Sequence, residues 1–224
     1  MNVNRFRFKT PKRAPREKLK LEETANQVTH GLGAVFSIFA LVLLYLRAQK
    51  FNDIEVTISY SVFGISLLLL YSASLFYHLA ESPKLKRLTK TLDHCGIYVL
   101  IAGTYTPFMV SVLKSTSGFM VLYCIWALAI FGIIFKIFFA HKFKILSTLI
   151  YVFMGWAVIA VWAPLVEVLP ALSFSWLLWG GIAYTGGVVF YLWDRLKFHH
   201  AIWHLFVLAG SLCHFIAVWQ SSTI

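Results

Sequence analysis

Four side chains that could take part in metal chemistry occur as two pairs, each with a spacing of four residues. The stretch KFHHAIWHLF contains His200 and His204, and the stretch YSASLFYHLAESP contains Ser74 and His78. Residues four apart lie on the same face of a helix, so each pair can act on one site. Imidazole nitrogens are favoured zinc ligands, and a catalytic zinc ion keeps three protein ligands and an open position for water.

An acidic residue, Asp93, stands at the beginning of another apolar run, in the sequence TLDHCG. Asp93 could hydrogen-bond a water at a metal ion and take its proton, while Ser74 could orient His78 or stabilise a developing oxyanion. Two simpler interpretations remain open. Aspartate is a favoured N-cap residue that complements the helix dipole, and serine is a small residue that allows helices to approach closely.

The elements that carry these residues are predicted to be membrane-spanning helices. The chain is 59% hydrophobic and only 13% charged, which is typical of a membrane protein. Apolar runs long enough to cross a bilayer, about 20 residues each, lie near 28–46, 54–80, 93–113, 118–140, 145–162, 171–193 and 200–219. We therefore predict an all-α membrane protein, a seven-transmembrane helix bundle, with a basic segment at 1–22 and one zinc-binding domain at 23–224. Glu167, between Pro164 and Pro170, is predicted to lie in a turn.

The distribution of Lys and Arg predicts the orientation of the bundle. All but three of the 20 Lys and Arg residues lie before the first run or near the connections after the second, fourth and sixth, which leaves Arg47, Lys50 and Lys114 on the other side. The positive-inside rule then predicts a cytoplasmic N-terminus and an outward C-terminus. The net charge of +11 is explained by this topology and by attraction to anionic lipid headgroups. No folded basic domain for nucleic acid is indicated.

The same topology places the metal-ligating candidates at one depth. His78 and His204 lie roughly 6–8 Å inside the cytoplasmic surface, and Asp93 lies at that surface or just within it. A chance cluster would have to match helix face, membrane side and depth together, so we predict that His78, His200 and His204 bind Zn²⁺. His214, about 15 Å deeper, is interpreted as a packing residue. Four further histidines are interpreted as helix-end residues wetted by headgroups: His30, His94, His141 and His199.

Four segments resemble the haemolysin III family, the bacterial branch of the progestin and adipoQ receptor family within a superfamily that includes alkaline ceramidases. They are ETANQVTH, SLFYH, LDHCGIYVLIAGTYTP and HAIWHLFVLAGSLCHF, and the resemblance extends from Leu21 to the C-terminus. It implies seven helices in a bacterial inner membrane and zinc in the cytoplasmic half. By motif, His78, His200 and His204 would be the ligands, with Ser74 and Asp93 around a water.

The resemblance also implies a role in lipid chemistry, with ceramidase-type amide hydrolysis in relatives and membrane-lipid homeostasis in the bacterial branch. The first hypothesis is therefore a zinc-dependent hydrolase acting on a lipid amide or ester. The second is a sensor of membrane state in which zinc is structural. The third is a pore-forming cytolysin, which the sequence supports poorly because the outward half has few ionisable groups beyond His214.

Overall fold

The structure is a computed structural model that describes residues 16–139 and 143–221, with side chains from residue 20, and the described residues contain helices and no strand. Seven helical segments are long and apolar enough to cross a membrane, which confirms the predicted fold class. The elements are α1 (Arg16–Gln49), α2 (Ile54–Leu79), α3 (Pro83–Pro107), a π-helical turn η1 (Phe108–Leu113), α4 (Thr116–Phe139), α5 (Lys144–Trp156), a 3₁₀ turn η2 (Ala157–Val161), α6 (Trp162–Val168), α7 (Ala171–Leu192) and α8 (His199–Gln220).

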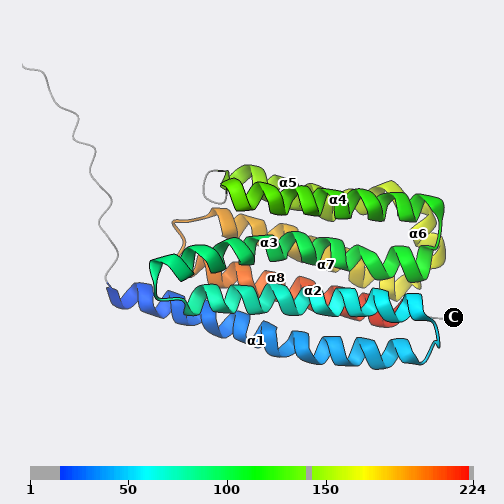
Figure 1. Cartoon of the computed structure of the whole chain (residues 1–224), viewed down its shortest axis with the longest axis horizontal. Helices are drawn as coiled ribbons and strands as arrows, with labels where there is room; N and C mark the ends of the chain where they lie inside the picture. The colour runs from blue at the N-terminus through cyan, green and yellow to red at the C-terminus, as the bar shows by residue number, and fades with distance from the viewer. Residues whose placement is uncertain (1–15, 140–142, 222–224) are drawn as a thin grey trace, which may run out of the picture.

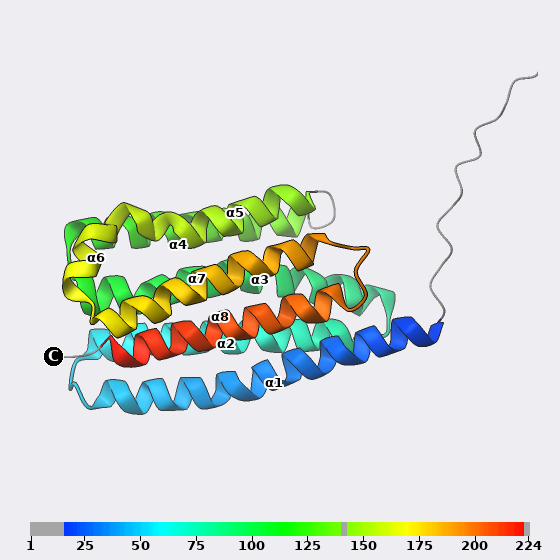
Figure 2. The ribbon, with the colours of Figure 1, turned by 180° about the vertical axis from the view of Figure 1, so that it is seen from behind.

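The helices run up and down along the long axis of the molecule (Figure 1). In the views from both sides, α1 and α2 lie on one side of the bundle and α4 and α5 on the other, with α3 and α7 between them (Figure 2). Helix α8 packs against both α7 and α1. The end of α2 and the starts of α1, α3 and α8 lie at one end of the bundle, which we call the α8-start end.

Helix α3 begins at Pro83, not near residue 93. The Ser82 hydroxyl accepts a hydrogen bond from the Leu85 amide (3.2 Å), and Pro83 occupies the first turn. Both features are typical of a helix start, because serine caps free amides and proline has no amide to leave unpaired. Asp93 therefore lies in the third turn of α3 and is buried. The interpretation of Asp93 as an N-cap is wrong.

Two prolines shape the other end of the bundle. A π-helical turn follows Pro107, and Lys114 ends it in a left-handed conformation with φ 41°. The turn predicted around Glu167 is displaced, because Glu167 lies in the short helix α6 and the chain turns only at Leu169 and Pro170. Both irregular turns, η1 and η2, lie within segments that are long and apolar enough to cross a membrane.

Hydrogen bonds within the core tie α2 to α8. The Tyr60 hydroxyl donates to the Val218 carbonyl (3.1 Å), and the Tyr71 hydroxyl donates to the Ser211 hydroxyl (2.8 Å). Both tyrosines have no exposed surface. Such bonds hold helices together in an apolar medium, where hydrocarbon contacts alone give little preference between protein and lipid. They fix the two helices that carry the candidate ligands relative to one another.

Candidate metal centre

The predicted ligands His78, His200 and His204 come together at the α8-start end. His78 lies in the last turn of α2, and the other two lie in the first turns of α8. Their ring centroids are 5.3 Å (His78–His200), 5.1 Å (His78–His204) and 4.5 Å (His200–His204) apart. One nitrogen from each ring lies within 4.8 Å of the others. The prediction that these three rings form one cluster is confirmed.

The donor set fits a metal ion. Tetrahedral zinc with bonds of 2.0–2.1 Å separates its nitrogen ligands by roughly 3.4 Å, which small rotations of these side chains achieve. The Nε2 atom of His78 is buried and has no hydrogen-bond partner among the described residues. A buried polar atom left in this state is costly, and an ion among the three rings would satisfy it. Imidazole suits zinc, and also copper, iron and nickel.

Asp93 and Ser74 lie beside the cluster. Asp93 is 8% exposed, and with His200 and His204 it lines a small chamber of about 20 Å³. A chamber of that size holds about one water molecule. Ser74 is fully buried one turn before His78, and its hydroxyl lies near the Asp93 carboxylate but outside hydrogen-bond geometry. The structure thus brings all five predicted site residues to one place.

Helix α1 contributes residues that the sequence analysis did not assign to the site. His30 is 3% exposed and stacks on His204, so its interpretation as a headgroup-wetted residue is wrong. The Glu23 carboxylate lies 3.1 Å from Nδ1 of His78, and the Thr29 hydroxyl lies 3.0 Å from Nδ1 of His204. Glu23 and His30 are seven residues apart and so share one helix face, which is the signal that could have placed them together.

The other histidines have different environments. His94 is half-buried and lines the small chamber. His199 is half-buried and bonds through Nδ1 to the Phe190 carbonyl (3.0 Å). His214 bonds through Nε2 to the Leu177 carbonyl of α7 (3.1 Å), which confirms that it is a packing residue. His141 lies outside the described residues.

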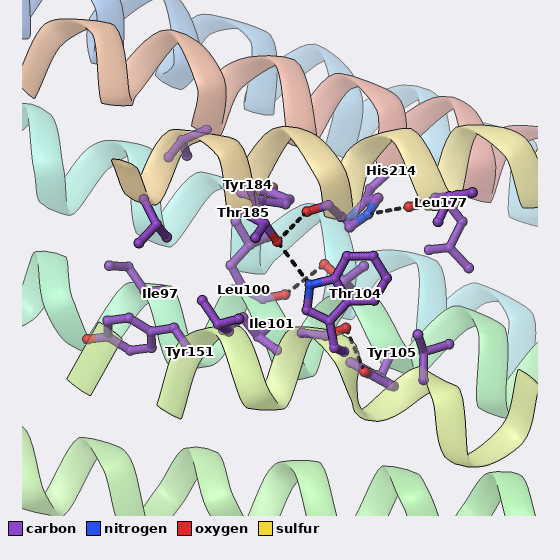
Figure 3. Close-up of a pocket in the computed structure, with 18 of the residues that line it drawn as sticks. Ile97, Leu100, Ile101, Thr104, Tyr105, Tyr151, Leu177, Tyr184, Thr185 and His214 are labelled. Carbon is purple, nitrogen blue, oxygen red and sulfur yellow. Dashed lines mark hydrogen bonds between the residues drawn. The ribbon is translucent and has the colours of Figure 1, made fainter. Parts of the chain in front are cut away.

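A larger apolar cavity of about 140 Å³ lies between α3, α5 and α7 (Figure 3). Its polar side chains are largely satisfied within the protein: Thr104 donates to the Leu100 carbonyl, and Thr185 accepts from the indole of Trp156 (2.9 Å). The cavity and the small chamber share five lining residues, so the two spaces are adjacent: Leu70, Ile97, Tyr191, Trp203 and Val207. An apolar space next to a few convergent polar groups is typical of a ligand site.

The chain is similar to known proteins over most of its length. The family model described as Haemolysin-III related matches residues 19–215. "Hemolysin-3" of Bacillus cereus is 49% identical over 197 residues, which cover 88% of this chain and 90% of that protein. "Hemolysin-3 homolog" of Bacillus subtilis (strain 168) is 48% identical over 197 residues, covering 88% and 92%. The human "Monocyte to macrophage differentiation factor" is 28% identical over 207 residues, covering 89% and 84%. No solved structure matches the chain.

Proposed function

The chain belongs to the Haemolysin-III related family, and we propose that this integral membrane protein is a zinc-dependent hydrolase that cleaves an amide or ester bond of a lipid. One observation carries the proposal. The Asp93 carboxylate lines the same one-water chamber as His200 and His204, and that chamber adjoins an apolar cavity. A proton acceptor, a metal-ligand set and room for hydrocarbon are thus adjacent, as hydrolysis of a lipid requires.

The roles of the side chains follow from their positions. A zinc ion held by His78, His200 and His204 would supply a Lewis acid that polarises a carbonyl and acidifies water. Asp93 accepts the proton of the attacking water and returns it to the leaving amine or alcohol. The buried Ser74 hydroxyl, one turn from His78, donates to the oxygen that becomes negative. Water is consumed, and a carboxylic acid and an amine or alcohol are released.

The apolar cavity indicates which chemical class of substrate the site would accept. An apolar protein cavity of about 150 Å³ admits benzene, so a space of about 140 Å³ accepts roughly six carbons of an acyl chain. A chain lying there would bring its carbonyl towards the chamber through the residues that line both spaces. Lipids of the surrounding membrane, with the metal centre near their headgroups, are therefore the proposed substrates, and control of membrane lipid composition is the proposed role.

A second candidate function is a sensor of membrane state with structural zinc. The observation that favours it is that the cluster joins α2 to α8, so an ion would fix the spacing of these helices at the α8-start end. In a sensor, removal of the metal lowers the melting temperature but abolishes no turnover, because there is none.

The test uses purified full-length protein in lipid nanodiscs, loaded with zinc and supplied with N-acylated sphingoid bases, phospholipids and acylglycerols. Release of fatty acid from one class by the wild type is expected. The Asp93→Asn variant should keep its zinc and lose turnover by about 10²–10⁴-fold, as for loss of a general base. Asp194→Asn is the matched control, since Asp194 is an exposed carboxylate paired with Lys144. Turnover in Asp93→Asn equal to that of the control would refute the mechanism, and zinc binding without turnover in the wild type would favour the sensor.

A further inference from the structure

Helix α1 starts well before the first predicted span, and its early turns contact both helices that carry the cluster. The Gln27 side chain donates to the His78 carbonyl at the end of α2 (3.0 Å). The Glu22 carboxylate accepts a hydrogen bond from the Phe198 amide just before α8 (3.3 Å). The first turns of α1 therefore hold the end of α2 and the start of α8 from one side (Figure 2).

The contact between Glu23 and His78 determines which ring nitrogen carries hydrogen. Oε2 of Glu23 lies 3.1 Å from Nδ1 of His78, and an ionised carboxylate only accepts hydrogen bonds. Nδ1 of His78 is therefore the donor, and in the neutral ring Nε2 keeps its lone pair. Nε2 is the atom that has no partner among the described residues. Lys86 binds the other oxygen of Glu23, and Asn26 donates to Oε2 (3.4 Å), so the carboxylate is held in place.

Thr29 imposes the same state on His204. The Thr29 hydroxyl lies within hydrogen-bond distance of the backbone carbonyls of Ala25 (2.9 Å) and Asn26 (3.0 Å), which can accept its single hydrogen. Its oxygen is then free to accept, and Nδ1 of His204, 3.0 Å away, donates to it. The lone pair of His204 therefore also lies on Nε2, and the His30 ring stacks against this imidazole.

We propose that Glu23 and Thr29 are positioning residues of the metal centre, which hold His78 and His204 with hydrogen on Nδ1 and with Nε2 free to bind a divalent cation. The inference rests on the zinc site of the proposed function but not on any turnover. Partners that accept the second N–H of a ligating histidine fix its orientation and raise its basicity, and their loss typically weakens metal binding by about 10–100-fold.

The experiment measures the affinity of the purified full chain for Zn²⁺ alone, by competition with a chromophoric chelator. Glu23→Gln removes the negative charge that pairs with Lys86. Thr29→Val removes the accepting oxygen and keeps a side chain of nearly the same shape. Each should bind Zn²⁺ about 10–100-fold more weakly than the wild type. Thr29→Ser keeps the hydroxyl and should restore the affinity.

Two matched controls carry the same chemical changes at neighbouring positions. Glu81→Gln removes an exposed carboxylate near the end of α2, and Thr24→Val removes an exposed hydroxyl that bonds to the α1 backbone at Lys20. Both should bind Zn²⁺ within about twofold of the wild type. Two further measurements distinguish a positioning role from a purely structural one. The absorption spectrum of the Co²⁺-loaded protein reports the ligand field of the metal. The melting temperature in excess chelator reports the stability of the metal-free protein and should not change.

The outcomes distinguish the two proposals. A wild type that binds no Zn²⁺ removes the proposed zinc function and this inference together. A wild type that binds Zn²⁺, with Glu23→Gln and Thr29→Val as tight as their controls and with an unchanged Co²⁺ spectrum, overturns this inference alone. If Glu23→Gln fails to fold, the comparison of Thr29→Val with Thr29→Ser decides the question.

Discussion

The ring of His30 stacks on the ring of His204, with centroids 3.5 Å apart and planes 29° apart. His30 is almost completely buried, and neither of its ring nitrogens has a hydrogen-bond partner among the described residues. Its ring also lies 5.3 Å from that of Tyr71, edge to face. The aromatic face of His30 thus covers the cluster on the side of α1.

His30→Phe tests whether His30 acts by its ring or by its nitrogens. Phenylalanine keeps the aromatic face against His204 and removes two buried polar atoms that lack protein partners. We expect zinc affinity within about twofold of the wild type and an unchanged or higher melting temperature, since burying an unsatisfied polar group costs about 1–3 kcal/mol. His30→Ala, which opens a cavity beneath His204, should lower the melting temperature. Loss of zinc in His30→Phe would instead make His30 a ligand.

The histidine cluster could be predicted from sequence because it depends on local features of the chain. The spacing of His200 and His204 fixes their shared face, and hydropathy with charge places His78 at the same depth. The role of α1 could not be predicted in this way. Whether Glu23 reaches His78 depends on how α1 packs against α2. Glu23 also lies before the apolar run near 28–46, so the predicted span does not include it.

The start of α3 was mispredicted for a related reason. Helix α3 begins as an exposed basic stretch and enters the apolar region only after several turns, so apolar character marks the membrane boundary and not the helix start. Ser82 followed by Pro83 was the available signal, since a capping serine before a first-turn proline favours a helix start there. With that boundary, Asp93 is a helix-interior carboxylate, and a capping role is excluded by its position.

Removing a proposed ligand tests the proposed metal centre directly. His204→Ala should weaken Zn²⁺ binding by at least a hundredfold, more than loss of an outer partner, and should lower the melting temperature of the zinc-loaded protein. His214→Ala is the control, because His214 is also buried in α8 but bonds to the α7 backbone at Leu177. The check is metal content by elemental analysis after dialysis. Equal zinc in both variants would contradict the site.

Filling the apolar cavity tests the proposed acyl site. Ile101 lines the cavity in Figure 3, and Ile101→Trp places a larger side chain there without touching the three histidines. Turnover of long-chain substrates should fall by roughly tenfold relative to short-chain ones. Each methylene that a hydrophobic pocket accepts or excludes changes the free energy of transition-state binding by about 1–3 kcal/mol. Ile130→Trp on the exposed face of α4 is the control. Chain-length preference is measured with a series of acyl substrates, and an unchanged preference would place the acyl chain elsewhere.

Liposomes test the cytolysin hypothesis. A pore needs a polar path through the bilayer, but the described core holds an apolar cavity whose Tyr184 hydroxyl is already paired with Ser211 (2.7 Å). We expect protein reconstituted at low protein-to-lipid ratios to release an encapsulated dye no faster than empty liposomes. Release that rises steeply with protein concentration and is unaffected by chelator would favour assembly into a pore over the metal-dependent function.

An ion-pair cluster at the end of the bundle away from the histidines gives a pH prediction. The Asp53 carboxylate caps α2 by accepting from the Glu55 amide (2.8 Å) and pairs with Lys114 (3.2 Å). The hydrogen bond from the Glu55 amide and then the one from Lys114 lower the pKa of Asp53 below its ordinary value of 3.8. The hydrogen bonds to Asp53 and then to Glu55 raise the pKa of Lys114 above its ordinary value of 10.5. The Asp53 contribution to stability is therefore present above pH 3.8 and is lost as the pH falls through the lowered pKa. The Lys114 contribution is present below pH 10.5 and is lost above it.

Asp53→Asn isolates the charge, because asparagine is also a good N-cap residue. At pH 7 the variant should melt about 2 °C below the wild type, a small effect as expected for exposed charges. The difference should close as the pH falls below 3.8 and through the lowered pKa of the wild-type carboxylate. Glu167→Gln in α6, an exposed carboxylate without a pairing partner among the described residues, is the control and should show no such trend. A melting difference that stays constant from pH 7 to pH 3 would mean that capping geometry, and not charge, is what Asp53 contributes.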